Sequence, residues 1–200
     1  MTRAYEIPKG YETRMRILKS VNQLLQETSV EALSVVDICS AVPISRQTFY
    51  RYFEDKYDAI NWYHRIDAEK SLAEIGRTLT WYEGVLNSLR YVFEEQEFYK
   101  KTLHSNRDYS SLVNYSMRCN AEDWRKTITE YNNYELTREL ELELQLWVRT
   151  GAQIVADWVK DGFKYTPEEF ARILDGCRPQ NLQRIMDDPV LEKRKRQSAR

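Results

Sequence analysis

The chain has 200 residues, of which 42% are hydrophobic and 30% are charged, with only six Gly and five Pro. This composition favours helices with short connections over a turn-rich β-fold, so we expect an all-α protein. The 30 Lys and Arg residues against 31 Asp and Glu residues give a net charge of -1, which excludes a generally basic nucleic-acid binder and requires any DNA affinity to come from local charge.

The cysteines, the histidines and the first residues argue against several other classes of protein. Cys39, Cys119 and Cys177 are far apart, which predicts neither a disulfide framework nor a metal site and fits a reducing cytoplasm. His64 and His104 have no acid or Cys at ligand spacing, so we expect no metal or catalytic role for them. No stretch approaches the roughly 18 apolar residues of a membrane span, and no secretion signal begins the chain. We therefore expect a cytoplasmic protein without a cofactor and without a membrane partner.

The N-terminal pattern predicts two helices and a tight turn. Apolar residues recur at helical spacing over residues 12–27, with basic and polar residues on the other face. A capping box formed by Ser34 and Asp37 begins a short second helix. This helix ends near residue 40, because Pro43 lacks an N–H group and keeps the residue before it out of the helical region.

A third helix is predicted to begin at Ser45, and it has two different faces. Phe49 and Phe53 are spaced to point inward, whereas polar residues crowd the opposite face. A short helix, a turn and a helix with a polar face form the arrangement that enters the major groove of DNA. Arg suits guanine, Gln suits adenine and Thr suits the thymine methyl group, while the surrounding side chains are placed to hold phosphates. The predicted DNA contacts are Ser34, Ser45, Arg46, Gln47, Thr48, Tyr50, Arg51 and Lys56.

The rest of the chain is also predicted to be helical. Helices are expected over residues 56–75, 80–101 and 112–131. Residues 139–146 alternate apolar and polar side chains as a strand would, but Glu and Leu favour helix and no second strand is available for pairing. We therefore predict a helix that continues from there until Asp161 and Gly162 end it. Thr166, Pro167 and two following acids begin another helix, and the basic tail is predicted to be disordered.

Residues 45–58 resemble the signature of the tetracycline-repressor (TetR) family. The matching string is Ser45-Arg46-Gln47-Thr48-Phe49-Tyr50-Arg51-Tyr52-Phe53-Glu54-Asp55-Lys56-Tyr57-Asp58. The similarity extends back to Val36 and forward to Trp62, where the chain resembles the branch containing regulators of dihydroxyacetone kinase operons. It appears again between Trp147 and Phe170. The resemblance implies DNA contacts from the third helix, a C-terminal domain that senses a ligand or a partner, and dimerisation through the last two long helices.

These features predict three parts of the chain. Residues 1–58 form a three-helix helix-turn-helix domain, residues 59–185 form a helical ligand and dimerisation domain, and residues 186–200 form the disordered tail. Five aromatic residues of the second domain either line an effector pocket or are plain core: Phe93, Tyr99, Tyr115, Trp124 and Trp147. The helix after residue 139 is apolar on both faces at its start, so we expect a second subunit to cover one of them. The predicted dimer residues are Leu142, Leu146, Gly151, Ile154, Trp158 and Phe170.

The sequence therefore predicts a homodimeric, sequence-specific transcription regulator whose affinity for double-stranded operator DNA responds to a small molecule or a partner protein. The alternative is a helical co-regulator that acts through protein contacts and has lost specific DNA binding. Pro43 favours this alternative, since many TetR-family members carry Gly in that turn. An enzyme is not expected, because the sequence has no nucleophile with a paired base, no Gly-rich phosphate loop and no metal cluster.

Overall fold

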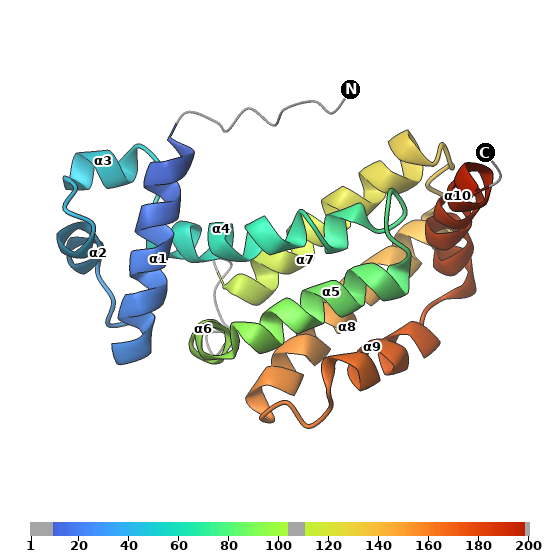
Figure 1. The fold of residues 1–200 in the computed structure, drawn as a ribbon. Coiled ribbons are helices and arrows are strands. Elements are labelled where there is room, and N and C mark those ends of the chain that lie inside the picture. Colours follow the sequence, from blue (N-terminus) through green and yellow to red (C-terminus); the bar gives the residue numbers. More distant parts are fainter. Residues whose placement is uncertain (1–9, 104–110, 199–200) are drawn as a thin grey trace. The chain divides into compact units, whose positions relative to one another are not determined.

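The computed structural model describes residues 10–103 and 111–198, which are predominantly helical (Figure 1). Among the described residues no β-strand forms, so the predicted all-α class is confirmed. None of the helices in these ranges is long and apolar enough to cross a membrane. His104, for which no role was predicted, lies outside the described residues. The chain divides into two compact units, Met1–Tyr63 and His64–Arg200.

The first unit holds α1 (Tyr11–Glu27), α2 (Val35–Ala41), α3 (Arg46–Tyr50) and the beginning of α4 (Lys56–Ala68). The unit extends to Tyr63, five residues beyond the predicted residue 58, and Ala59 and Ile60 in this stretch of α4 are buried. Phe49 and Phe53 are 0% and 2% exposed, and their ring centroids are 5.7 Å apart, as their inward spacing predicts. The other fully or nearly fully buried residues of this core include Ile17, Leu18, Val21, Leu25 and Ile38.

Local hydrogen bonds explain why α2 and α3 begin and end where they do. The Ser34 hydroxyl accepts from the Asp37 N–H at 3.2 Å, and the Ser34 N–H donates to the Asp37 carboxylate at 3.0 Å, which is the predicted capping box. On either side of Pro43, the N–H groups of Val42 and Ile44 donate to carbonyl oxygens of α2 at 3.2 and 3.1 Å. The turn is therefore closed by backbone hydrogen bonds, and Pro43 leaves both helices intact.

The second unit contains most of the remaining helices. They are α5 (Trp81–Glu94), α6 (Gln96–Thr102), α7 (Leu112–Lys126), α8 (Arg138–Lys160), α9 (Pro167–Gly176) and α10 (Gln180–Ser198). Within this unit α9 packs along α5, and α7 packs along α8. Residues 139–146 lie inside α8, so the preference for helix over strand in this segment is confirmed. Thr166 caps α9 and Pro167 is its first residue, also as predicted.

The predicted helix over residues 56–75 is too long, since α4 ends at Ala68. The Ser71 hydroxyl donates to the Asp67 carbonyl oxygen at 2.9 Å, and a short 3-10 turn, Leu72–Glu74, follows. Ile75 is fully buried beside Gly84 of α5, where an added Cβ would lie 2.3 Å from its Cγ1 atom. The chain leaves the axis of α4 to make this close contact, which only a glycine at position 84 permits.

The predicted helix over residues 80–101 is divided into α5 and α6. Glu95 separates them with φ -95° and ψ 30°, outside the helical region. After this change of direction Phe98 and Tyr99 are 1% and 2% exposed. The interruption at Glu95 thus allows both rings to be buried, which stabilises the fold.

The tail was predicted to be disordered from residue 186, but α10 continues to Ser198. Leu182, Ile185 and Met186 are buried, so the first half of α10 has an apolar face against the unit. Further along, the Arg194 guanidinium donates to both carboxylate oxygens of Glu83 at 2.8 and 2.9 Å. This hydrogen bond lowers the pKa of Glu83 to about 2. The tail is therefore attached to α5, through contacts that its own composition does not reveal.

A buried ion pair fixes α10 more firmly. Arg178, whose side chain is 3% exposed, donates to Asp187 of α10 at 2.7 Å and pairs with Asp175 at 2.9 Å. The other carboxylate oxygen of Asp187 accepts from the backbone N–H of Trp81 at 2.7 Å, which satisfies a backbone donor at the start of α5. Asp187 thus serves two elements at once.

We expect Asp187→Ala to lower the free energy of unfolding by about 3 kcal/mol, because a buried guanidinium loses a partner and the first turn of α5 loses its acceptor. Asp188→Ala, the exposed neighbour on α10, is the matched control and should change it by less than about 0.5 kcal/mol. Urea unfolding at neutral pH measures both. Equal losses in the two variants would show that α10 is not anchored as described.

Candidate DNA-binding surface and effector cavity

Helix α3 begins with a hydroxyl cap. The Ser45 Oγ accepts from the Thr48 N–H at 3.1 Å, and the two hydroxyl oxygens lie 2.9 Å apart. Ser45 is therefore the N-cap that the sequence predicts. The cap fixes the direction in which the first turn of α3 presents its side chains.

The outer face of α3 carries polar side chains that the fold does not use. Arg46, Gln47 and Arg51 are exposed, and none of the three forms a side-chain hydrogen bond or an ion pair within the described residues. Tyr50 is 56% exposed, with its ring edge against the buried ring of Phe49 at 5.6 Å. A guanidinium and an amide that are free to pair can each form two hydrogen bonds with the edge of a base.

Two other predicted DNA contacts hold the domain together. The Lys56 ammonium donates to the carbonyl oxygens of Glu31 and Leu33 at 2.9 and 2.7 Å, just before α2. The Ser34 hydroxyl donates to Asp37 at 2.6 Å, and this hydrogen bond lowers the pKa of the Asp37 carboxyl. Lys56 and Ser34 therefore fix the start of α2, and their contact with phosphates stays a prediction.

The second unit contains a cavity of about 90 Å³ lined mainly by aliphatic and aromatic residues of α5, α7 and α8. Of the five aromatic residues predicted for an effector pocket, the structure brings three to its wall: Tyr99, Trp124 and Trp147. Phe93 and Tyr115 do not line it. Phe93 instead packs on the rings of Trp158 and Phe163, at centroid distances of 6.4 and 5.3 Å.

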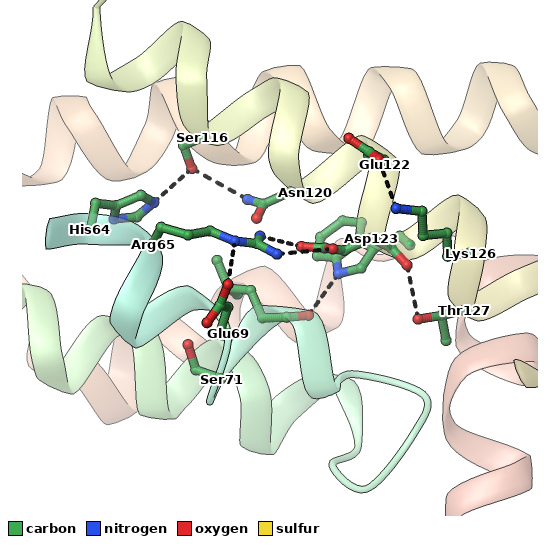
Figure 2. A network of polar contacts seen from close by, with 12 residues as sticks. His64, Arg65, Glu69, Ser71, Ser116, Asn120, Glu122, Asp123, Lys126 and Thr127 are labelled. Atoms are coloured by element: carbon green, nitrogen blue, oxygen red, sulfur yellow. Dashed lines mark hydrogen bonds and ion pairs between the residues drawn. The ribbon is translucent and has the colours of Figure 1, made fainter. Parts of the chain in front are cut away.

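One end of the cavity is polar. His64 of α4 is buried, with Nδ1 3.0 Å from the Tyr99 hydroxyl and Nε2 3.2 Å from the Ser116 hydroxyl. Figure 2 shows Ser116 between His64 and Asn120, whose Nδ2 donates to Ser116 at 3.3 Å. Burial, with a smaller contribution from the positive charge of Arg65, lowers the pKa of His64 to about 4. Sequence reasoning missed His64, because it considered only metal and catalytic roles and no local pattern marks a cavity residue.

The next residue of α4 forms an ion pair with α7. Both Nη atoms of Arg65 bond the carboxylate of Asp123, with 3.2 Å between Nη2 and Oδ1, and Nε lies 3.2 Å from Glu69 (Figure 2). Asp123 is 8% exposed, and its hydrogen bond is the main cause that raises the pKa of Arg65. His64 and Arg65 thus join α4 to α7 at two adjacent points.

Comparison with known families identifies both units. Residues 17–59 match the family model described as bacterial regulatory proteins, tetR family, and residues 79–177 match the TetR model described as transcriptional regulator C-terminal region. The chain belongs to the TetR family. TetR-family members are transcription factors without enzymatic activity, so the regulator is not an enzyme, as predicted.

Individual relatives agree with this assignment. The HTH-type dhaKLM operon transcriptional activator DhaS of Lactococcus lactis subsp. lactis (strain IL1403) is 30% identical over 101 residues, which are 50% of this chain and 54% of that protein. The match therefore spans about half the length of this curated relative. The solved structure of a dihydroxyacetone kinase operon activator DhaS is similar with a TM-score of 0.58 and 22% identity, covering 82% of this chain and 93% of that one. The TetR family repressor AlkX from Dietzia sp. strain DQ12-45-1b gives 0.57 and 18%, covering 87% and 97%. The two structures show a shared fold.

Three of the predicted dimer residues lie on the surface of this TetR-family regulator. Leu142 and Leu146 of α8 are 60% and 59% exposed, and Ile154 is 37% exposed. Covering such exposed apolar side chains with another protein surface would be favourable, because it removes them from water.

The other three predicted dimer residues are placed elsewhere. Trp158 and Phe170 are each 4% exposed, with ring centroids 5.0 Å apart, so they form the contact between α8 and α9 inside the subunit. Gly151 lines the cavity. The prediction that Trp158 and Phe170 meet a partner is wrong, because helical spacing alone does not tell an inward stripe from an outward one.

Asp67, near the end of α4, is a partly buried acid. Its carboxylate accepts from the Ser71 hydroxyl at 3.2 Å, but burial dominates and raises its pKa to about 7. In the unfolded chain the carboxyl has its ordinary pKa of about 4. Between these values the folded state holds a proton that the unfolded state has lost, so stability falls as the pH rises from 4 to 7.

We expect Asp67→Asn to stabilise the protein, because the amide is neutral at every pH. The gain in unfolding free energy should be about 2 kcal/mol larger at pH 8 than at pH 5. Glu69→Gln, an exposed acid two residues further on, is the control and should show no such difference. Urea denaturation at the two pH values measures the effect, and a gain for Asp67→Asn that does not grow with pH would contradict it.

Proposed function

We propose that this TetR-family regulator is a homodimer that binds operator DNA sequence-specifically, with an affinity modulated by a molecule in the cavity of the second unit. The observation that carries the proposal is the outer face of α3, where Arg46 and Gln47 are exposed and unpaired above the buried Phe49. The similarity to DhaS, a named activator of the dhaKLM operon, supports control of an operon.

Base reading would come from the first turn of α3. Arg46 can donate two hydrogen bonds to guanine, and Gln47 can exchange two with adenine. Arg51 and Tyr50, further along, would hold phosphates and fix the register. In a two-fold dimer each α3 would enter one of two successive major grooves, about 34 Å apart.

Modulation would pass along α4, which belongs to both units. Near its start Lys56 holds the carbonyl oxygens before α2, and further on His64 contacts the polar end of the cavity. A ligand at this end would contact the hydrogen-bonded chain of His64, Ser116 and Asn120, and it would therefore bind one position of α4 better than another. That difference in affinity is the free energy by which the ligand would alter DNA binding.

Replacing a base-reading residue should weaken specific binding selectively. We expect Arg46→Ala and Gln47→Ala each to reduce affinity for DNA from upstream of the protein's own gene by about 5- to 100-fold, with little change for a scrambled duplex. Fluorescence anisotropy at fixed moderate salt measures both affinities.

Arg51→Ala is the matched control for this experiment, because loss of a phosphate contact should weaken both duplexes about equally. If Arg46→Ala and Gln47→Ala also weaken both duplexes equally, α3 does not read bases. If the unaltered protein protects no nearby promoter, the helical co-regulator becomes the better description.

Dimerisation should depend on the exposed leucines of α8. We expect the double variant Leu142→Glu, Leu146→Glu to be monomeric at micromolar concentration, since two carboxylates would be buried in an apolar interface. Val36→Glu, which alters an apolar residue of α2 that is 53% exposed, is the matched control and should remain a dimer. Light scattering after size exclusion gives the mass, and a dimeric double variant would place the interface elsewhere.

A further inference from the structure

One buried hydrogen-bond acceptor at the polar end of the cavity has no partner. Asn120 is 7% exposed and uses its Nδ2 on Ser116, but its Oδ1 atom accepts no hydrogen bond from any described residue. The neighbouring polar groups are already in use, because the two ring nitrogens of His64 face Tyr99 and Ser116. An unpaired buried carbonyl lowers stability, and a ligand that brings a donor to it recovers the lost hydrogen bond.

The cavity is also uncharged. Among the described residues that line it there is no Lys, Arg, Asp or Glu. The low pKa of His64 keeps that side chain neutral near pH 7. Arg65 and Asp123 lie nearby, but they pair with each other and do not line the cavity. A carboxylate, phosphate or ammonium ligand would lose its water here without gaining a counter-charge.

The size and the walls of the cavity restrict the ligand further. An apolar protein cavity of about 150 Å³ accommodates the six non-hydrogen atoms of benzene, so 90 Å³ corresponds by the same ratio to about four. Leu89, Val92, Trp124 and Val148 supply apolar wall, and Ser88 is the remaining polar side chain. This lining favours a short carbon chain over a molecule with polar groups at both ends.

We infer that the cavity binds a small neutral alcohol, with its alkyl chain against Trp124 and Val148 and its hydroxyl donating to the Oδ1 atom of Asn120. The inference rests on the proposed function, in which the cavity is the effector site. The ligand is selected by three features together: the buried Oδ1 atom of Asn120, which has no partner among the described residues, the absence of charge in the lining, and little room.

Three probes with five non-hydrogen atoms each separate these features. 1-Butanol has a donor, its isomer diethyl ether has none, and propionate carries a charge. The full chain, labelled with 15N, is titrated without DNA while the Asn120 side-chain amide and the indole signals of Trp124 and Trp147 are followed by NMR. We expect saturable shifts with 1-butanol at millimolar concentration, at least tenfold weaker binding of the ether, and no binding of propionate.

Each deviation from this pattern overturns a stated part of the inference. Equal affinity for 1-butanol and diethyl ether would exclude the hydrogen bond to Asn120. Tighter binding of propionate would exclude a neutral site. Failure of 1-butanol to produce saturable shifts would exclude the alcohol site altogether, including the case in which water holds the position.

Asn120→Leu tests the acceptor directly, because leucine is close to asparagine in size and has no carbonyl group. The preference for 1-butanol over diethyl ether should fall from at least tenfold to about onefold. A mere filling of the cavity would weaken both probes and keep their ratio. Asn87→Leu, at an exposed position of α5, is the matched control and should keep the preference. If Asn120→Leu fails to fold, the comparison of probes in the unaltered protein still decides.

The outcome is independent of the proposed function. The titration contains no DNA, and the DNA-binding assay contains no alcohol, so either can fail alone. If 1-butanol binds as expected but leaves affinity for the operator duplex unchanged, the ligand class stands and the role of the cavity as effector site is wrong. If DNA binding is specific but no alcohol binds, the inference falls and the regulator remains.

Discussion

The partly buried pairing of Arg65 with Asp123 sets the register of α4 on α7, and the polar end of the cavity depends on that register. Removing two charges from water is costly, and the surrounding hydrogen bonds offset the cost. Arg77 donates to the backbone oxygen of Asp123 at 3.2 Å and to the Thr127 hydroxyl at 2.8 Å. Successive residues of a helix point about 100° apart, so fixing Arg65 on Asp123 also fixes the direction of His64. His64 then reaches Ser116 at 3.2 Å.

A well-packed scaffold allows the cavity to persist. On one side the Trp81 ring lies 4.6 Å from Trp124 and 5.5 Å from Trp147, and Asp187 holds the start of α5 by the Trp81 N–H. Packed aromatic rings cannot close on a void without moving as a group. The unpaired Oδ1 of Asn120 costs the fold stability at the polar end of this cavity, and such a cost is common at functional sites.

The parts of this fold that sequence reasoning predicts are those that local interactions decide. Capping boxes, helical spacing and the breaking effect of Pro43 define α1 to α3, and the same rules separate α8 from a strand. The errors concern contacts between distant residues. Asp187 binds the N–H of Trp81 from 106 positions away, and Ile75 bends the chain toward Gly84. Nothing near Trp158 or Phe170 tells which neighbour covers them, and nothing near His64 marks a cavity.

The first unit spends much of its positive charge on its own structure. Arg16 donates to the Val42 carbonyl oxygen at 3.1 Å, Lys56 donates to two further carbonyls, and Arg14 lies over the ring of Trp62 at 5.3 Å. Arg46 and Arg51 remain on the outer face of α3, in a chain whose net charge is -1. One copy of the first unit, with so few cations available for phosphates, would bind DNA weakly. When two subunits form a dimer, the second copy of this unit meets the same DNA molecule intramolecularly, which multiplies the affinity without new charge. In the proposed dimer the exposed leucines of α8 are therefore as necessary for DNA binding as the residues that touch the bases.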